Sequence, residues 1–233
     1  MWGERRCSLR YAPGGQPSLK EQVLEPRGPR SVAVDRTTIV ALAALVAASA
    51  LAWVVLVTYE PPMSFLGFTV GWSLMMAAMM LPSIAPLWLL YRGSRVGMAV
   101  GYLAVWSVVG VVPYVAMERA MGITVPVVLG LAGVYELSPL KSACLRRCRN
   151  PAAFLMEHYR SGAVRLGVEH GIWCLGCCVG LMAVLVLAAS MQLVWAVVIA
   201  GAVFVQKVLP RGELSARLIG IGLLVAALAV AVT

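Results

Sequence analysis

Charged residues are scarce in this sequence. They make up 12% of its 233 residues, whereas 61% of the residues are hydrophobic and the mean hydropathy is +0.87. Soluble domains carry about 25% charged residues, because much of their surface faces water. A soluble domain of this length has no way to bury so much apolar surface. The scarcity of charge therefore excludes a soluble globular domain, and the long apolar runs predict helices that cross a bilayer.

Several motifs of enzymes and pumps are also absent. The sequence contains no Walker loop, no dinucleotide-binding fingerprint, no nucleophile elbow and no motif of a primary pump. We therefore predict no catalytic residue and no bound organic cofactor, and a binding protein is favoured over an enzyme.

The first 35 residues lack apolar periodicity and are rich in Arg, Gly and Pro, a composition typical of disordered segments. No convincing cleavage site of small residues follows the first apolar run, so we expect an uncleaved anchor there. We predict two parts: a disordered basic cytoplasmic tail over 1–35 and a transmembrane helical domain over 36–233.

Seven apolar runs in the second part are candidates for membrane spans. They cover residues 37–58, 63–90, 97–117, 121–136, 171–189, 192–208 and 214–232. The fourth run is short, contains Pro126 and ends on Glu136, so a half-crossing or tilted segment is an alternative there. The predicted fold class is all-α, a polytopic transmembrane helical bundle of about seven spans.

The basic residues predict the orientation of these spans. With the amino terminus in the cytoplasm, all of the 19 Lys and Arg residues except Arg119 fall on the cytoplasmic side. This bias predicts an N-in, C-out arrangement, with a cytoplasmic connection over 137–170. Because the basic residues lie in the connections and form no patch, the predicted partner is the lipid bilayer and not nucleic acid.

Five of the six cysteines lie between residues 144 and 178. Cys144 and Cys148 are four residues apart, so they share one face if this connection is helical. Cys174, Cys177 and Cys178 form a C-x-x-C-C motif at the start of the predicted fifth span. The inferred cytoplasmic side makes stable disulfides unfavourable for these residues.

His170 and Met182 extend the second cysteine motif, because His170, Cys174, Cys178 and Met182 follow one another at intervals of four. Thiolate, imidazole and thioether groups are the donors that copper(I) prefers, with zinc as the alternative metal. Single free cysteines are usually small buried hydrophobes. Five within a short stretch, with a histidine in phase, favour metal ligands. The predicted ligands are Cys144, Cys148, His170, Cys174, Cys177, Cys178 and Met182.

The second span contains a further candidate set of four methionines. Met75 and Met79 share one helix face, and Met76 and Met80 share the neighbouring one. Core packing is the default role of methionine, and a thioether site for copper(I) is the alternative. Pro82 predicts a break or kink just beyond them, reinforced by Pro86.

Two other features have structural interpretations. Ionisable residues at the predicted span ends, among them Glu136 and Lys207, are expected to anchor the helices or to snorkel. Pairs of glycines at G-x-x-x-G spacing, such as Gly97 with Gly101 and Gly167 with Gly171, are expected to let helices pack closely.

Three motifs occur in order along the chain. They are W-x-x-M-x-x-A-M-M-L-P over 72–82, L-K-x-x-C-L-x-x-C-R-x-P over 140–151 and G-x-x-C-x-G-C-C-x-x-L-M over 171–182. Together they resemble a bacterial family of predicted metal-binding integral membrane proteins, sometimes labelled copper chaperones. The resemblance covers roughly 71–232 and implies metal binding by the five cysteines and by the methionines of the second span. It also implies a Glu-Lys pair late in the sixth span, where this chain has Gln206 and Lys207.

The favoured function is therefore binding of a soft metal ion, copper(I) first and zinc second, by a multi-pass membrane protein. Such a protein would handle or deliver metal ions at the inner face of the membrane, with a metal-receiving membrane protein as its partner. Two alternatives stay open. One is a membrane thiol-disulfide oxidoreductase that uses Cys174 and Cys177 as its redox pair and Cys144 and Cys148 as resolving cysteines. The other is a structural or assembly subunit in which the cysteines only pack.

Overall fold

A computed structural model describes residues 36–58, 64–119, 124–158, 161–188 and 192–232. The predicted tail over 1–35 lies outside the described residues. Within the described ranges the chain is helical and forms no strand, so the predicted all-α class is confirmed. The elements are α2 (Arg36–Thr58), α3 (Phe65–Met80), η1 (Leu81–Ile84), α4 (Ala85–Leu90), α5 (Arg95–Val109), α6 (Val111–Arg119), α7 (Val125–Leu137), α8 (Pro139–Arg149), α9 (Pro151–His158), α10 (Ala163–Ala183), the π-turn η2 (Val184–Ala188), α11 (Leu193–Val208) and α12 (Gly212–Val232).

Five helical stretches are long and apolar enough to cross a membrane. They are Arg36–Thr58, Phe65–Leu90, Arg95–Val115, Ala163–Leu187 and Gly212–Val232. The two other apolar helices, α7 and α11, have 13 and 16 residues. At a rise of about 1.5 Å per residue they reach only about 20 and 24 Å, less than the roughly 30 Å of a hydrocarbon core. For α7 this matches the half-crossing alternative.

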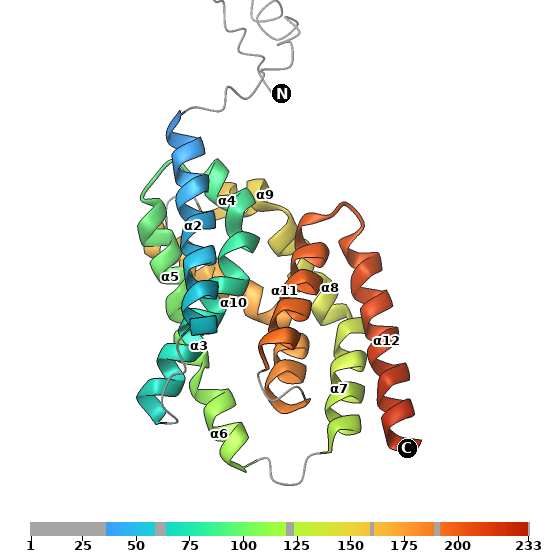
Figure 1. Cartoon of the computed structure of the whole chain (residues 1–233). Coiled ribbons are helices and arrows are strands. Elements are labelled where there is room, and N and C mark those ends of the chain that lie inside the picture. The colour runs from blue at the N-terminus through green and yellow to red at the C-terminus, as the bar shows by residue number, and fades with distance from the viewer. Residues whose placement is uncertain (1–35, 59–63, 120–123, 159–160, 189–191, 233) are drawn as a thin grey trace, which may run out of the picture. The chain divides into compact units, whose positions relative to one another are not determined.

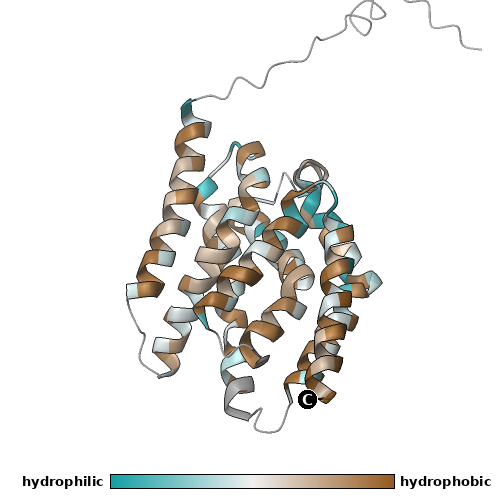
Figure 2. Ribbon diagram, turned by 45° about the vertical axis from the view of Figure 1, so that its right-hand side comes forward, coloured by the Kyte–Doolittle hydropathy of each residue, from teal (hydrophilic) through white to brown (hydrophobic). Residues whose placement is uncertain are grey.

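The outer helices present apolar side chains over their whole length. In α2 and α12 only 17% of the most hydrophobic window is buried. Large hydrophobic side chains such as Leu51, Val57, Leu218 and Leu228 are 50% exposed or more. Figure 2 shows hydrophobic residues along these helices and hydrophilic residues mainly toward the end at which α2 begins. Water does not tolerate so large an exposed apolar surface, whereas lipid does.

Successive long helices alternate in direction (Figure 1). Ser49 of α2 donates a hydrogen bond to the Ala78 carbonyl, and Trp88, further along the chain, donates to Ala41, so α2 and the α3–α4 stretch are antiparallel. The start of α5 lies beside the start of α2, because Arg95 donates to the Thr37 carbonyl. The chain therefore passes repeatedly between two ends of the bundle.

The second apolar stretch is interrupted where the two prolines predicted a break. Residues 81–84 form the single 3-10 turn η1, with Pro82 at its start, and α4 follows with Pro86 near its start. Proline has no N–H to continue the helix ladder, so the backbone tightens and changes direction here. A second interruption separates α7 from α8 at Ser138, whose backbone is extended and whose side chain accepts from the Lys141 N–H at 3.2 Å.

Glycines bring α5 and α10 into close contact. A Cβ added at Gly101 would meet the backbone of Val164, and one added at Gly167 would meet the backbone of Met98. At Gly171 it would lie 3.1 Å from the Val105 side chain. The packing role predicted for the G-x-x-x-G pairs is therefore confirmed on these two helices.

Helix α10 begins earlier than the predicted fifth span. The apolar run starts at residue 171, but the helix starts at Ala163, so the end of the predicted polar connection is part of α10. The rest of that connection contains α8 and α9. As a result Cys174 lies in the middle of α10 and not near its start, and the C-x-x-C-C motif is surrounded by other helices.

Candidate metal centre

Three cysteines of α10 form a compact, buried thiol cluster. The Sγ atoms of Cys174, Cys177 and Cys178 all lie within 4.8 Å of one another, and their side chains are 0–1% exposed. Residues three and four apart on a helix share a face, which is why the C-x-x-C-C spacing gathers these sulfurs. The Cys177 and Cys178 sulfurs are 3.5 Å apart, and the Cys177 thiol donates to the Cys174 carbonyl at 3.1 Å.

A fourth sulfur reaches the cluster from α8. The Sγ atom of Cys148 lies 3.7 Å from that of Cys177, and Cys148 is only partly buried. Cys144, one turn earlier on α8, packs over Gly176, where an added Cβ would lie 2.7 Å from its sulfur. The structure therefore brings the two cysteine motifs together.

Cys144 lies outside the group of sulfurs that face one another. That group consists of Cys174, Cys177 and Cys178, with Cys148 beside Cys177, whereas the Cys144 sulfur packs against Gly176. Burial raises the pKa of the Cys144 thiol, and the nearby Lys141 ammonium only partly opposes this effect.

Lys207 supplies a buried positive charge next to the cluster. Its ammonium group donates to the Cys174 Sγ at 2.8 Å and to the Ser83 hydroxyl at 3.2 Å. The expectation that Lys207 would snorkel is wrong, because its side chain is only 8% exposed. The 3-10 turn η1 brings Ser83 to the end of α11, and this gives the ammonium a second partner inside the protein. A buried cation beside a thiol stabilises the thiolate form, so Lys207 can act as the counter-ion of a metal-binding Cys174 thiolate.

Tyr102 of α5 is the other polar neighbour of Cys174. Its hydroxyl lies 2.9 Å from the sulfur and is completely buried. Nothing in the sequence around Tyr102 pointed to this contact. The only available signal was its position one residue after Gly101, on the face where α5 packs closely against α10.

A second buried polar network connects α7, α8 and α11. The Lys141 ammonium contacts the Glu136 carboxylate at 2.5 Å and the Gln206 amide oxygen at 2.9 Å. The Gln206 amide in turn donates to Glu136 at 3.0 Å. Glu136 was expected to anchor a helix end, but its side chain is 0% exposed and forms this internal ion pair. An amide at position 206 donates and accepts at once, which a second carboxylate would not do.

This network holds α8 in place. Arg149, the last residue of α8, donates to the Gln206 carbonyl at 2.6 Å and to the Pro210 carbonyl at 2.9 Å. The network thus ties both ends of α8 to the end of α11. Since α8 carries Cys148, these bonds determine how Cys148 meets the thiol cluster.

His170 lies one turn before Cys174 but does not belong to the three-cysteine group. Its ring packs against Tyr102, at a centroid distance of 5.9 Å, and against Phe154 at 5.2 Å. It is 4% exposed, and its Nδ1 has no hydrogen-bond partner among the described residues. The structure therefore places His170 next to the thiol cluster in sequence, but packed between the aromatic rings of Tyr102 and Phe154.

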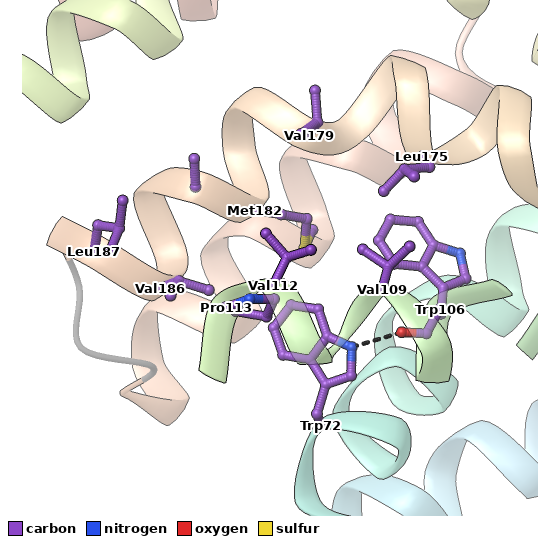
Figure 3. A pocket seen from close by; sticks show the side chains of 11 residues that line it. Trp72, Trp106, Val109, Val112, Pro113, Leu175, Val179, Met182, Val186 and Leu187 are labelled. Carbon is purple, nitrogen blue, oxygen red and sulfur yellow. Dashed lines mark hydrogen bonds between the residues drawn. The ribbon is translucent and has the colours of Figure 1, made fainter. Parts of the chain in front are cut away.

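The five candidate methionines are all buried. Met75, Met76, Met79, Met80 and Met182 are 0–5% exposed. Met182 lines an apolar cavity of about 140 Å³ together with Trp72 and Trp106 (Figure 3). None of the five belongs to the thiol cluster itself.

The comparisons with known proteins bear on this arrangement. A family model described as copper chaperone matches residues 69–230 and so includes both cysteine motifs and the methionine motif. Searches among curated proteins and among solved structures find no match. The match extends over well more than half of the chain, from α3 to α12, and the chain therefore belongs to the PpoB2 copper chaperone family.

Proposed function

We propose that this protein is a multi-pass membrane protein that binds copper(I) on its thiol cluster and delivers the ion to a partner at the inner face of the membrane. The observation that carries the proposal is the buried set of Cys174, Cys177 and Cys178 with Lys207 beside it. In this proposal the first 35 residues form a cytoplasmic tail, and the partner is a metal-receiving membrane protein.

The sulfur spacing suits a metal ion. With metal–sulfur bonds of about 2.3 Å, sulfurs that share an ion lie about 4 Å apart. The distances of 3.5 Å from Cys177 to Cys178 and 3.7 Å from Cys177 to Cys148 are close to this value. Small rotations of these side chains would therefore let the sulfurs of Cys148, Cys174, Cys177 and Cys178 bind one ion.

Charge balance supports a thiolate-bound copper(I). Two thiolates and one copper(I) ion carry a net charge of −1, which the Lys207 ammonium neutralises. A neutral complex is the least costly one in a buried, water-poor site. Zinc bound by three thiolates would also be neutral beside Lys207, so zinc is the second candidate. Copper(I) is favoured because sulfur is the donor type it prefers, and because buried thioethers are present in the same core.

The proposed topology has seven passes, N-in and C-out. Besides the five long apolar stretches, the short helices α7 and α11 would each make one pass, and α8 would lie in the cytoplasmic connection. In Figure 1 the described chain starts with Arg36 at one end of the bundle and finishes at the other. The positive-inside bias then puts the start of α2, and the end of α11 that carries Lys207, at the cytoplasmic side. Interrupted helices at membrane depth are tolerated where they line a binding site.

Copper would enter through Cys148. It is the one sulfur of the set that is partly exposed, and it lies at the end of α8 beside the basic Arg147 and Arg149. The ion would pass from Cys148 to Cys177 by ligand exchange and then settle on the fully buried sulfurs. A partner that presents thiolates would withdraw it along the same route.

The test is metal analysis of anaerobically purified protein. The triple variant Cys174→Ser/Cys177→Ser/Cys178→Ser is expected to lose the stoichiometric copper(I) that the wild type retains. The matched control is Cys7→Ser, which removes the one cysteine of the tail and should keep full copper content. The proposal fails if the wild type holds no stoichiometric copper, or if the triple variant holds as much as the wild type.

One observation favours a second candidate function. The Cys148 and Cys177 sulfurs, on different helices, are 3.7 Å apart, and side-chain rotation would bring them to the roughly 2.05 Å of a disulfide. A thiol-disulfide oxidoreductase would cycle this pair during turnover. Trapping of a mixed disulfide with substrate in a Cys148→Ser variant favours the oxidoreductase, whereas a copper site that stays reduced throughout favours the chaperone.

A further inference from the structure

Two buried stripes of residues run lengthwise through the core, one on α3 and one on α10. On α3, Trp72, Met76 and Met80 follow at intervals of four and are 0–2% exposed. On α10, Cys174, Cys178 and Met182 follow at the same interval and are 0–4% exposed. Each step is about one helical turn, or about 6 Å along the axis.

The stripes are joined at the end nearer to Lys207. Ser83 lies three residues after Met80 and donates to the Met80 carbonyl at 2.7 Å. The Lys207 ammonium contacts the Ser83 hydroxyl and the Cys174 sulfur at the same time. The Lys207 side chain therefore connects the end of the methionine stripe on α3 to the thiol cluster.

The stripes meet again at their other end, around the apolar cavity of about 140 Å³. Trp72 and Met182 both line this cavity, and in Figure 3 the Met182 side chain points from α10 toward the indole rings of Trp72 and Trp106. The Trp72 indole is held in place, because its N–H donates to the Trp106 carbonyl at 2.8 Å and it packs over Gly110.

The two meeting points lie near opposite ends of the bundle. Ser83 is seven residues from the end of α4, and Trp72 is seven residues from the start of α3. At about 1.5 Å per residue, each lies about 10 Å from its end of the interrupted helix. The sulfur-lined core between them covers the middle of that helix.

The groups in this core have the chemistry of a transit path. Thioethers are neutral soft donors that bind copper(I) without a proton having to leave. The faces of tryptophan rings also attract a cation, and this attraction needs no negatively charged side chain. Such neutral sites hold copper(I) more weakly than thiolates do. Weak binding suits a transport path, because the ion has to leave each site in order to move to the next.

We propose that Met80, Met76 and Met182 form a thioether relay that carries copper(I) from the thiol cluster to the cavity between Trp72 and Trp106, and so toward the opposite face of the membrane. This inference rests on the proposed copper binding. It adds that the cluster is a loading site and that the protein moves the ion across the bilayer as well as delivering it at one face.

The experiment uses the full chain in liposomes that enclose a membrane-impermeant copper(I) chelator, with copper(I) added outside under reducing conditions. The double variant Met76→Leu/Met182→Leu keeps the volume of the core and removes two sulfurs. Copper(I) transfer in this variant is expected to be slower by about tenfold or more, because each hop loses its donor. The control Met156→Leu changes an 84% exposed methionine and should transfer at the wild-type rate.

Copper content, measured on the same preparations, separates the relay from the thiol cluster. The relay predicts that Met76→Leu/Met182→Leu retains stoichiometric copper on the cluster, and this retention also shows that the variant is folded. Wild-type protein that binds copper but transfers none overturns the relay and leaves the proposed function standing. Equal transfer by the double variant and the wild type also overturns the relay. The relay is overturned as well if the double variant loses the copper of the thiol cluster while the wild type keeps it. Absence of copper from the wild type refutes the proposed function itself.

Discussion

The ammonium group of Lys207 lies 2.8 Å from the sulfur of Cys174, although 33 residues separate them in the sequence. This contact places an ammonium group directly beside the thiol cluster. It also connects α10, α11 and the 3-10 turn η1 through one side chain, because the same ammonium contacts Ser83.

Lys207→Met should weaken copper(I) binding. The variant leaves Cys174 without its counter-ion, and a charge-assisted hydrogen bond contributes enough for an expected loss of affinity of about tenfold or more. Competition with a copper(I) chelator of known affinity measures the change. Arg217→Met removes the same charge from an exposed position and should bind copper normally. Equal affinities in the two variants would contradict the assigned role of Lys207.

Cys144→Ser should leave the copper content unchanged, because the Cys144 sulfur packs against Gly176 and does not belong to the group of Cys174, Cys177 and Cys178. The pKa of the Cys144 thiol is raised by burial, so this thiol remains protonated until the solution is more alkaline than for an ordinary cysteine. Alkylation of Cys144 in the folded protein should therefore be slow at neutral pH and should accelerate only at alkaline pH. Mass spectrometry of protein treated with iodoacetamide at several pH values checks this, and fast labelling at neutral pH would speak against it.

Glu136→Gln should destabilise the folded protein. The substitution leaves the Lys141 ammonium buried without its carboxylate, and breaking a buried pair on one side costs about 3–5 kcal/mol. Thermal unfolding in detergent measures the loss. The double variant Glu136→Gln/Lys141→Met removes both charges and should recover part of the stability.

The exposed pair of Arg146 and Glu213, 3.7 Å apart, is the matched control for that measurement. Glu213→Gln should change stability by no more than about 1 kcal/mol, because exposed ion pairs are screened by solvent. Similar losses at positions 136 and 213 would show that the buried network does not hold α8.

Gly167→Ala should disrupt the packing of α10 on α5. The added methyl group would meet the backbone of Met98, which has no room to move aside, so the melting temperature should fall and copper binding should weaken. Gly201→Ala on α11 is the control, because nothing lies within 4 Å of a Cβ added there. That substitution should be neutral or slightly stabilising, since alanine favours a helix by about 1 kcal/mol over glycine.

Much of the local structure was predictable from the sequence. Apolar runs of bilayer length predicted the long helices, and Pro82 predicted the interruption of the second one, because both effects depend on neighbouring residues alone. The spacing of Cys174, Cys177 and Cys178 likewise predicted a shared helix face. The start of α10 was missed, since Arg165, Glu169 and His170 in its first turns interrupt the apolar run although the helix continues through them.

The long apolar helices, the helical class and the shared face of the thiols on α10 were thus determined by the sequence by itself, because composition and helical periodicity are local properties. Only the tertiary structure decided which groups surround the thiols: Lys207 and Tyr102 around Cys174, Cys148 beside Cys177, and Glu136 with Lys141 and Gln206. These contacts join helices that are far apart in the chain. The contacts depend on how the helices pack, which is set by their glycine faces and by their interruptions. The spacing of residues along the sequence does not specify this packing.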